Sequence, residues 1–201
     1  MAKKIIAVAG ATGAQGGGLT SAILADPEGG FAVRALTRDV NSDKAKALAR
    51  AGAEVVAADV DDVASMRKAF AGADAAYCVT FFWDHFSPER EKAQAHNMAI
   101  AAKDAALKHV IWSTFEDSRD SIPLGDNRMP TLQGKYKVPH FDSKAEANAY
   151  FTELRLPVTF LLTSFYWDNL IHFGMGPKKG EDGKLAFTLP MGDKKLPGMA
   201  A

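Results

Sequence analysis

The sequence predicts an α/β protein with a Rossmann-type, doubly wound parallel sheet and helices on both of its faces. Three observations support this fold class. Short runs rich in Ile, Val and Ala alternate with longer helical segments, which is the pattern of repeated βαβ units. The first run is almost entirely apolar, as expected for a strand that is buried on both faces of a parallel sheet. A glycine-rich turn joins that run to the first helix.

Six strands are expected, each from a short apolar run. In chain order they cover residues 5–9, 31–36, 54–58, 75–79, 110–112 and 158–162. The first helix begins in the glycine turn and stops at Asp26-Pro27, because the residue before a proline disfavours the helical conformation. Later helices are expected to begin at Ser42, at Asp61 or Asp62, at Ser87-Pro88 and at residue 141, and residues 115–139 are expected to form a loop.

Composition and charge narrow the class of partner. The 201 residues carry 24 Lys and Arg against 24 Asp and Glu, so the chain has no positive field that would attract nucleic acid or an anionic membrane. The single cysteine, Cys78, is expected as a small core residue. The apolar run at residues 5–9 is too short for a signal peptide or a membrane span. We therefore expect a cytoplasmic protein whose partners are small molecules or other proteins. An oligomeric state is also compatible with the sequence.

The turn between the first strand and the first helix places Gly10, Gly13 and Gly16 at its first, fourth and seventh positions. Glycines here let the backbone approach a pyrophosphate closely, and the free N–H groups of the following helix point toward that anion. The alternative is that the glycines only make a tight turn. Because the turn lies between a strand and a helix, the sequence favours a dinucleotide site.

The residue that follows the second strand bears on the cofactor. Arg38 stands where NAD-binding proteins usually carry a carboxylate, and arginine suits the 2′-phosphate of NADP(H). Asp39 follows directly, so NAD(H) is kept as the weaker alternative. Asp59, after the third strand, accepts from the adenine amino group or caps the next helix. Thr80 and Phe81 leave the fourth strand and are expected along the cofactor.

Four segments taken together resemble the NmrA-like family of atypical short-chain dehydrogenases. They are VAGATGAQGG at 8–17, LTR at 36–38, HFDSK at 140–144 and FYWDN at 165–169. The resemblance covers essentially the whole chain and is strongest to the redox-sensor branch. It implies an NADP site lined by Gly10, Thr12, Gly13, Ala14, Gln15, Gly16, Arg38, Asp59, Thr80, Lys144, Tyr166 and Asn169.

Active members of that superfamily carry Tyr-x-x-x-Lys, and no tyrosine of this chain has a lysine four residues later. By resemblance, His140 and Lys144 stand at the positions of this tyrosine and lysine, one helical turn apart. His140 either supplies a proton or only marks a loop-to-helix junction. Lys144 either holds ribose hydroxyls or faces solvent. Ser113 either orients a substrate or ends its strand as a turn residue. No histidine pair has metal-site spacing.

Relatives in the family continue for roughly another hundred residues, the size of a small domain. We therefore expect a shortened chain, with a Rossmann domain over residues 1–165 and the start of an incomplete substrate or partner subdomain over residues 166–201. Residues 185–189 are expected to form a strand that has no evident partner.

Three functions are compatible with the sequence. The first is an NADP(H)-binding redox sensor or regulator that acts on a protein partner. The second is an NAD(P)H-dependent reductase of a quinone or related carbonyl compound, with an aromatic slot built from Phe81, Phe82, Trp83, Phe165, Tyr166 and Trp167. The third is an interaction module whose cofactor site has lost its function.

Overall fold

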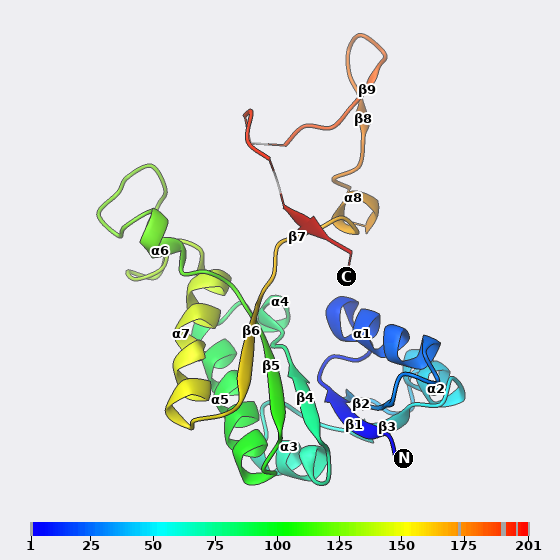
Figure 1. The fold of residues 1–201 in the computed structure, drawn as a ribbon. Coiled ribbons are helices and arrows are strands. Elements are labelled where there is room, and N and C mark those ends of the chain that lie inside the picture. Colours follow the sequence, from blue (N-terminus) through cyan, green and yellow to red (C-terminus); the bar gives the residue numbers. More distant parts are fainter. Residues whose placement is uncertain (1, 173, 190–191, 196, 201) are drawn as a thin grey trace. The chain divides into compact units, whose positions relative to one another are not determined.

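The computed structural model describes residues 2–172, 174–189, 192–195 and 197–200. The chain divides into two compact units, Met1–Leu162 and Thr163–Ala201, and Figure 1 shows the course of the chain through both. Among the described residues, no helix has both the length and the apolar character that a membrane span requires.

The first unit is built on a six-stranded sheet. Its strands are β1 (Lys4–Val8), β2 (Phe31–Thr37), β3 (Glu54–Ala57), β4 (Ala75–Cys78), β5 (His109–Thr114) and β6 (Val158–Leu162). They lie in the order β3-β2-β1-β4-β5-β6, and every neighbouring pair is parallel. This is the doubly wound order, so the predicted fold class is confirmed. The order reverses at β1, where Val8 is paired with both Ala35 and Tyr77.

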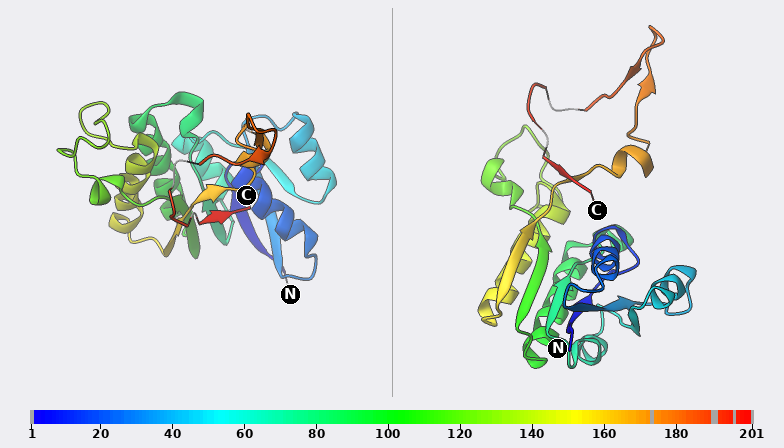
Figure 2. Two further views of the ribbon diagram at one scale, coloured as in Figure 1. Left: turned by 90° about the horizontal axis from the view of Figure 1, so that it is seen from above. Right: turned by 45° about the vertical axis from the view of Figure 1, so that its right-hand side comes forward.

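Helices cover both faces of this sheet. They are α1 (Ala14–Ala25), α2 (Asp43–Arg50), α3 (Val63–Phe70), α4 (Phe82–His85), α5 (Pro88–Asp104), α6 (Ser118–Ser121) and α7 (Pro139–Glu153). Helices α3, α5 and α7 lie side by side on one face, whereas α1 and α2 lie on the other (Figures 1 and 2). This division follows from the topology, because right-handed crossovers on the two sides of β1 run in opposite directions along the sheet.

Polar caps start three of these helices where the sequence predicts them. Ser42 accepts from the backbone N–H of Ala45, Asp62 from that of Ala64, and Ser87 from that of Arg90. Each cap satisfies an amide that the first helical turn leaves without a partner. The structure thus decides between the two expected starts of α3 in favour of Asp62.

The core includes the sheet and the largest buried side chains of helices α3, α5 and α7, and partly buried side chains of α1 and α2 pack against it. Trp112 of β5 is fully buried, stacks on Phe151 of α7 with ring centroids 5.0 Å apart, and donates its indole N–H to Asn148. Cys78 is also fully buried, and burial raises the pKa of its thiol. It therefore packs as a small apolar side chain, as predicted.

The segment between β5 and α7 is mostly loop, as predicted, and Asp142 holds its two ends together. The buried Asp142 carboxylate accepts from the backbone N–H of Ser118 at 3.0 Å, of Lys137 at 2.8 Å and of Val138 at 3.2 Å. This side chain belongs to the first turn of α7, so the HFDSK segment fixes the loop that precedes it.

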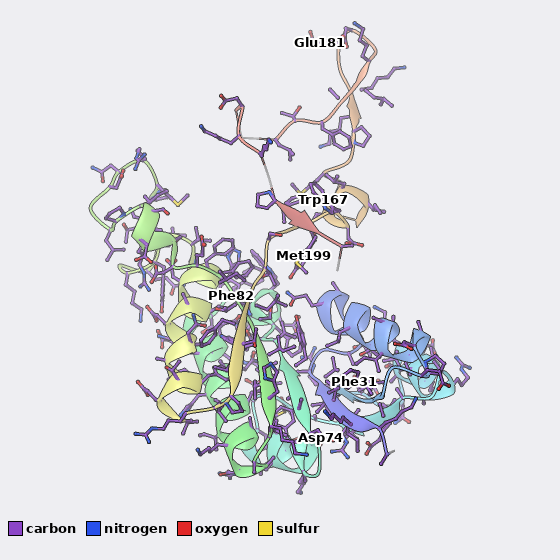
Figure 3. The ribbon with its side chains drawn as sticks, viewed as in Figure 1. Phe31, Asp74, Phe82, Trp167, Glu181 and Met199 are labelled. Atoms are coloured by element: carbon purple, nitrogen blue, oxygen red, sulfur yellow. The ribbon has the colours of Figure 1, made fainter. Side chains whose placement is uncertain are left out.

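The second unit contains two small two-stranded sheets. Strand β7 (Phe165–Tyr166) pairs in parallel with β10 (Gly198–Met199), and the N–H of Trp167 donates to the carbonyl of Met199 at 3.0 Å (Figure 3). Strand β8 (Lys178–Lys179) pairs antiparallel with β9 (Leu185–Ala186). The expected strand near residue 185 is therefore shorter than predicted and does have a partner. A short helix, α8 (Asn169–His172), follows β7.

Candidate functional site

A cavity of about 390 Å³ opens in the first unit at the carboxyl ends of β1, β2 and β3. In doubly wound sheets, ligands bind at this edge, where the strand order reverses. Five of its lining residues are ones that the sequence predicts for a cofactor site, namely Gly10, Thr12, Gly13, Arg38 and Phe81. The others are Ala9, Leu36, Thr37, Asp39, Ser42, Lys44, Ala58, Val60, Met66 and Asp84.

The glycine turn is as tight as its sequence predicts. Gly10 has a φ of +65°, and a Cβ atom there would lie 3.0 Å from the Phe81 ring. A Cβ atom on Gly16 would lie 2.5 Å from the carbonyl oxygen of Gly10 and 2.6 Å from that of Ala9. Because backbone atoms fill that space, only glycine lets the helix pack so closely on the end of β1.

Helix α1 begins at this turn with an N-terminus that suits an anion. Gly13 is its N-cap and makes no side-chain cap, and the first turn of α1 holds no acidic residue. The first amides of a helix have no partner within the helix, and its dipole adds a partial positive charge there. The predicted residues Ala14, Gln15 and Gly16 form this first turn.

Two cations and a hydroxyl line the cavity together with the glycine turn. Arg38 Nη2 lies 2.9 Å from Asp84 Oδ2, and the guanidinium lies 5.9 Å from the centroid of the Phe81 ring. Lys44 Nζ lies 3.4 Å from the carbonyl oxygen of Thr12. Ser42 completes this part of the lining. Such a group of donors fits a phosphate.

Asp59 has a local structural role. Its carboxylate accepts from the N–H of Asp61 at 2.9 Å, and its own N–H donates to Ser65 at 3.0 Å. Asp59 is exposed and lies outside the cavity lining given above. These contacts shape the turn before α3, and a contact from Asp59 to adenine stays a prediction.

A second polar cluster is buried where β4 ends. Lys144 Nζ lies 2.7 Å from Glu91 Oε1 and also donates to the hydroxyl of Thr80. The Thr80 hydroxyl donates to the same carboxylate oxygen at 2.6 Å. Burial lowers the pKa of Lys144, and the charge of Glu91 opposes that effect. The alternative that Lys144 faces solvent is therefore wrong.

His140 lies one turn before Lys144 and contacts aromatic rings. Its ring centroid is 4.7 Å from that of Trp83, 5.5 Å from Phe82 and 4.8 Å from Phe141. Figure 3 labels Phe82 at this end of the sheet. Burial lowers the pKa of His140, and the charge of Lys144 acts in the same direction. The imidazole is therefore mostly neutral near pH 7.

Ser113 contacts the glycine turn. Its hydroxyl donates to the side-chain oxygen of Gln15 at 2.6 Å, and the Tyr77 hydroxyl donates to the same oxygen. Gln15 thus links the first turn of α1 to β4 and β5. Ser113 is buried at the end of β5, and a substrate-orienting role for it stays a prediction.

The remaining predicted residues, Tyr166 and Asn169, belong to the second unit, in β7 and at the start of α8. Their role at a cofactor stays a prediction. Glu91 is not predicted from the sequence, because its neighbours are charged and the segment resembles a solvated helix face. Asp84 is not predicted either, because no motif connects it with Arg38. Among the described residues, no cluster of three or more His, Cys, Asp or Glu forms a metal site.

Comparison with known proteins identifies the family. The model of the NmrA-like family matches residues 2–200. This chain belongs to the NmrA-like family. The oxidoreductase FrzB of Cladobotryum sp. is 29% identical over 209 residues, in a match that covers 96% of this chain and 59% of FrzB. The oxidoreductase cpsB of Aspergillus campestris is 43% identical over 155 residues, covering 74% of this chain and 44% of cpsB. The chain thus spans about half the length of these relatives.

Solved structures of NmrA-like and related proteins share the fold. NmrA, a negative transcriptional regulator, was solved with NADP, and its structure has a TM-score of 0.77, 27% identity, and coverage of 100% of this chain and 59% of NmrA. NmrA was also solved with NAD, with a TM-score of 0.77, 26% identity, and coverage of 100% and 58%. Triphenylmethane reductase of Citrobacter sp., complexed with NADP(H), has a TM-score of 0.65, 27% identity, and coverage of 85% and 53%.

The residues of this chain fit the adenosine and pyrophosphate half of such a dinucleotide. Gly16 lets α1 pack closely on the end of β1, and the turn before α1 lines the same cavity as Arg38, Ser42 and Lys44. A hydrophobic wall for an adenine ring is present as well, since Leu36, Ala58, Val60 and Met66 line the same cavity.

Proposed function

We propose that this chain binds NADP(H) at the carboxyl edge of its sheet and acts as a nicotinamide redox sensor for a protein partner. In this proposal the pyrophosphate contacts the N-terminus of α1, the adenosine fills the cavity, and Arg38, Ser42 and Lys44 hold the 2′-phosphate. The observation that carries the proposal is the cavity itself, which runs from an uncapped helix N-terminus to two cations.

The preference for NADP(H) over NAD(H) is supported by charge. A 2′-phosphate is a dianion near neutral pH and gains from both Arg38 and Lys44. The relative NmrA was solved with NADP and with NAD. Asp39 also lines the cavity, so its carboxylate would accept a hydrogen bond from a ribose hydroxyl of NAD(H). NAD(H) would then bind with lower affinity than NADP(H).

Sensing, instead of turnover, is supported by the groups around Lys144. No tyrosine stands four residues before it, and His140 at that position is mostly neutral because burial and Lys144 lower its pKa. A neutral imidazole is a poor proton donor. The Lys144 ammonium is held by Glu91 and Thr80. In this proposal Lys144 binds and orients the cofactor, and His140 does not serve as an efficient acid.

A bound nicotinamide cofactor supplies a hydride when it is reduced and accepts one when it is oxidised. The chain itself contributes the anion-binding turn, the cations for the phosphate and the Lys144 ammonium. A sensor also requires that two conformations of the protein bind NADP(H) with different affinities.

The test is a calorimetric titration of the purified chain with NADPH, NADP⁺ and NADH in one buffer at one salt concentration. We expect NADPH and NADP⁺ to bind with unequal affinity and NADH to bind at least about tenfold more weakly, the loss of one charge-assisted contact. Absence of binding by all three nucleotides contradicts the proposal. Equal affinity for the two NADP redox forms contradicts the sensing role alone.

A second candidate function is an NADPH-dependent reductase of a quinone or related carbonyl compound. The exposed Trp83 ring beside His140 favours it, because a flat acceptor could stack there. FrzB and cpsB are named oxidoreductases, and the solved relatives include a quinone oxidoreductase, QOR2 of Escherichia coli, at 25% identity and a TM-score of 0.62, with coverage of 83% of this chain and 51% of QOR2.

This candidate is tested by following NADPH oxidation with a panel of quinones and enones. Steady NADPH oxidation by the wild type that is lost in His140→Ala would contradict the sensor proposal and support the reductase. His96→Ala is the matched control, since His96 lies on α5 and packs against Tyr150, with ring centroids 4.7 Å apart. Turnover that both variants lose equally argues for a general structural effect.

A further inference from the structure

Glu91 of α5 is a buried acid that the proposed function does not use. Its side chain is 0% exposed. Carboxylates are almost never fully buried unless they are paired, because removing the charge from water is costly. A sequence that keeps a glutamate at this position therefore has a compensating interaction, and the contacts of Glu91 identify it.

One carboxylate oxygen of Glu91 faces Lys144. Lys144 Nζ is 2.7 Å from Oε1, and the Thr80 hydroxyl is 2.6 Å from the same atom. Lys144 also donates to the Thr80 hydroxyl, so two of the three N–H groups of the ammonium point at Thr80 and Glu91. Among the described residues Lys144 makes no other hydrogen bond or ion pair, so its third N–H has no protein acceptor.

The other oxygen faces His85. Glu91 Oε2 lies 3.6 Å from His85 Nε2, and within the described part of the chain neither buried atom has a hydrogen-bond partner. His85 Nδ1 accepts from the N–H of Ser87 at 3.0 Å, so the proton of a neutral His85 lies on Nε2 and points toward Glu91. His85 is therefore a second donor group beside the Glu91 carboxylate.

We propose that Glu91 is a positioning residue for Lys144, which keeps the buried ammonium charged and directs its remaining N–H toward the nicotinamide ribose of the cofactor. This inference rests on the proposed function, in which Lys144 contacts the bound dinucleotide. Glu91 itself touches neither cofactor nor substrate in this scheme.

The electrostatic surroundings of Lys144 make this role testable. Glu91 faces it from α5, Thr80 from the end of β4, the Trp112 ring from β5 at 5.2 Å, and His140 lies one turn earlier on α7. Burial lowers the pKa of Lys144, whereas Glu91 raises it. Without the carboxylate charge, Lys144 loses its proton at a lower pH, and the neutral amine has only two N–H groups.

The experiment compares NADPH affinity of the wild type and Glu91→Gln, which keeps the shape of the side chain, between about pH 7 and about pH 9. We expect the affinity of Glu91→Gln to fall about tenfold over this range, the loss of one charge-assisted contact, and that of the wild type to change less than about twofold. The double variant Glu91→Gln, Lys144→Met should bind weakly with no such pH dependence.

The matched control is Glu146→Gln. Glu146 lies on α7, is partly buried and pairs with Lys92 and Arg119 instead of Lys144, so its variant should keep the wild-type pH profile of NADPH affinity. A flat profile for Glu91→Gln at wild-type affinity overturns the inference and leaves the proposed function intact. Failure of the wild type to bind NADPH overturns the proposed function instead.

A measurement on the unsubstituted protein covers the case in which Glu91→Gln does not fold. The side-chain carbon NMR signals of Lys144 should be those of an ammonium at pH 7 and should shift when NADPH is added. A neutral amine at pH 7, or signals that NADPH leaves unchanged, would overturn the positioning role.

Discussion

Arg38 and Lys144 are two cations near the same edge of the sheet, and each pairs with one carboxylate at nearly the same distance. Arg38 lies 2.9 Å from Asp84, with the two side chains 66% and 51% exposed. Lys144 lies 2.7 Å from Glu91, with side chains 8% and 0% exposed. Water and salt screen the first pair and barely reach the second. Similar geometry therefore implies different energies and different roles.

The largest difference should appear in stability when each carboxylate is removed. Glu91→Ala leaves the Lys144 charge buried without a partner, and breaking such a pair costs about 3–5 kcal/mol. Asp84→Ala removes a pair that contributes about 0–1 kcal/mol. Urea unfolding of the two variants and the wild type at about pH 7 measures both effects.

The loss of stability in Glu91→Ala should depend on pH in a definite direction. In Glu91→Ala the pKa of Lys144 in the folded chain drops further below its unfolded value, so the folded state binds fewer protons and stability rises with pH. The destabilisation should therefore be fully present at neutral pH values below the lowered pKa and become smaller as pH rises through it. A loss as small as that of Asp84→Ala would show that the two pairs do not differ in the way that burial implies.

The next largest effect concerns affinity at the exposed pair. Arg38→Gln should weaken NADPH binding by about 1.5–3 kcal/mol, the value of a charge-assisted contact to a phosphate, and should change NADH affinity little. Calorimetric titration with both nucleotides measures this selectivity. Stability should stay within about 0.5 kcal/mol of the wild type, as for most exposed positions. Equal losses for NADPH and NADH would place the 2′-phosphate away from Arg38.

A third prediction concerns the close packing of α1 on the glycine turn. Gly16→Ala places a methyl group 2.5 Å from the carbonyl oxygen of Gly10, so the helix must move away from β1 at a cost of about 1–3 kcal/mol. Both NADPH and NADH should bind more weakly, because both have the pyrophosphate. Gly18→Ala on the same helix is the control, since Gly18 is exposed. Wild-type NADH affinity in Gly16→Ala would contradict the pyrophosphate position.

The comparison also explains how much the sequence could predict. The strands, the doubly wound class, the caps at Ser42 and Ser87 and the cavity residues Gly10 and Arg38 follow from local patterns, since each depends on a strand end or a helix start. Arg38 directly follows β2, so it lies at the ligand-binding edge of the sheet regardless of how distant segments pack.

Long-range pairs could not be predicted in this way. Asp84 reaches Arg38 from a position 46 residues later, and Glu91 reaches Lys144 across the contact between α5 and α7. The sequence around Glu91 is Pro-Glu-Arg-Glu-Lys, which is typical of an exposed first turn. Only the packing of α5 distinguishes the buried Glu91 from the exposed Glu89.

The smallest expected effect tests whether the exposed pair competes with the ligand. Asp84 holds Arg38 through one nitrogen, and its negative charge opposes a 2′-phosphate at the same guanidinium. Asp84→Asn should therefore tighten binding of 2′,5′-ADP about two- to fivefold, the value of an exposed ion pair, without changing that of 5′-AMP. Asp43→Asn, an exposed acid on α2 outside the cavity lining, controls for net charge. The gain should shrink at high salt, because salt screens exposed charges. Weaker binding by Asp84→Asn would instead mean that Asp84 orients Arg38 for the phosphate, and the exposed pair would then resemble the buried pair in function although not in energy.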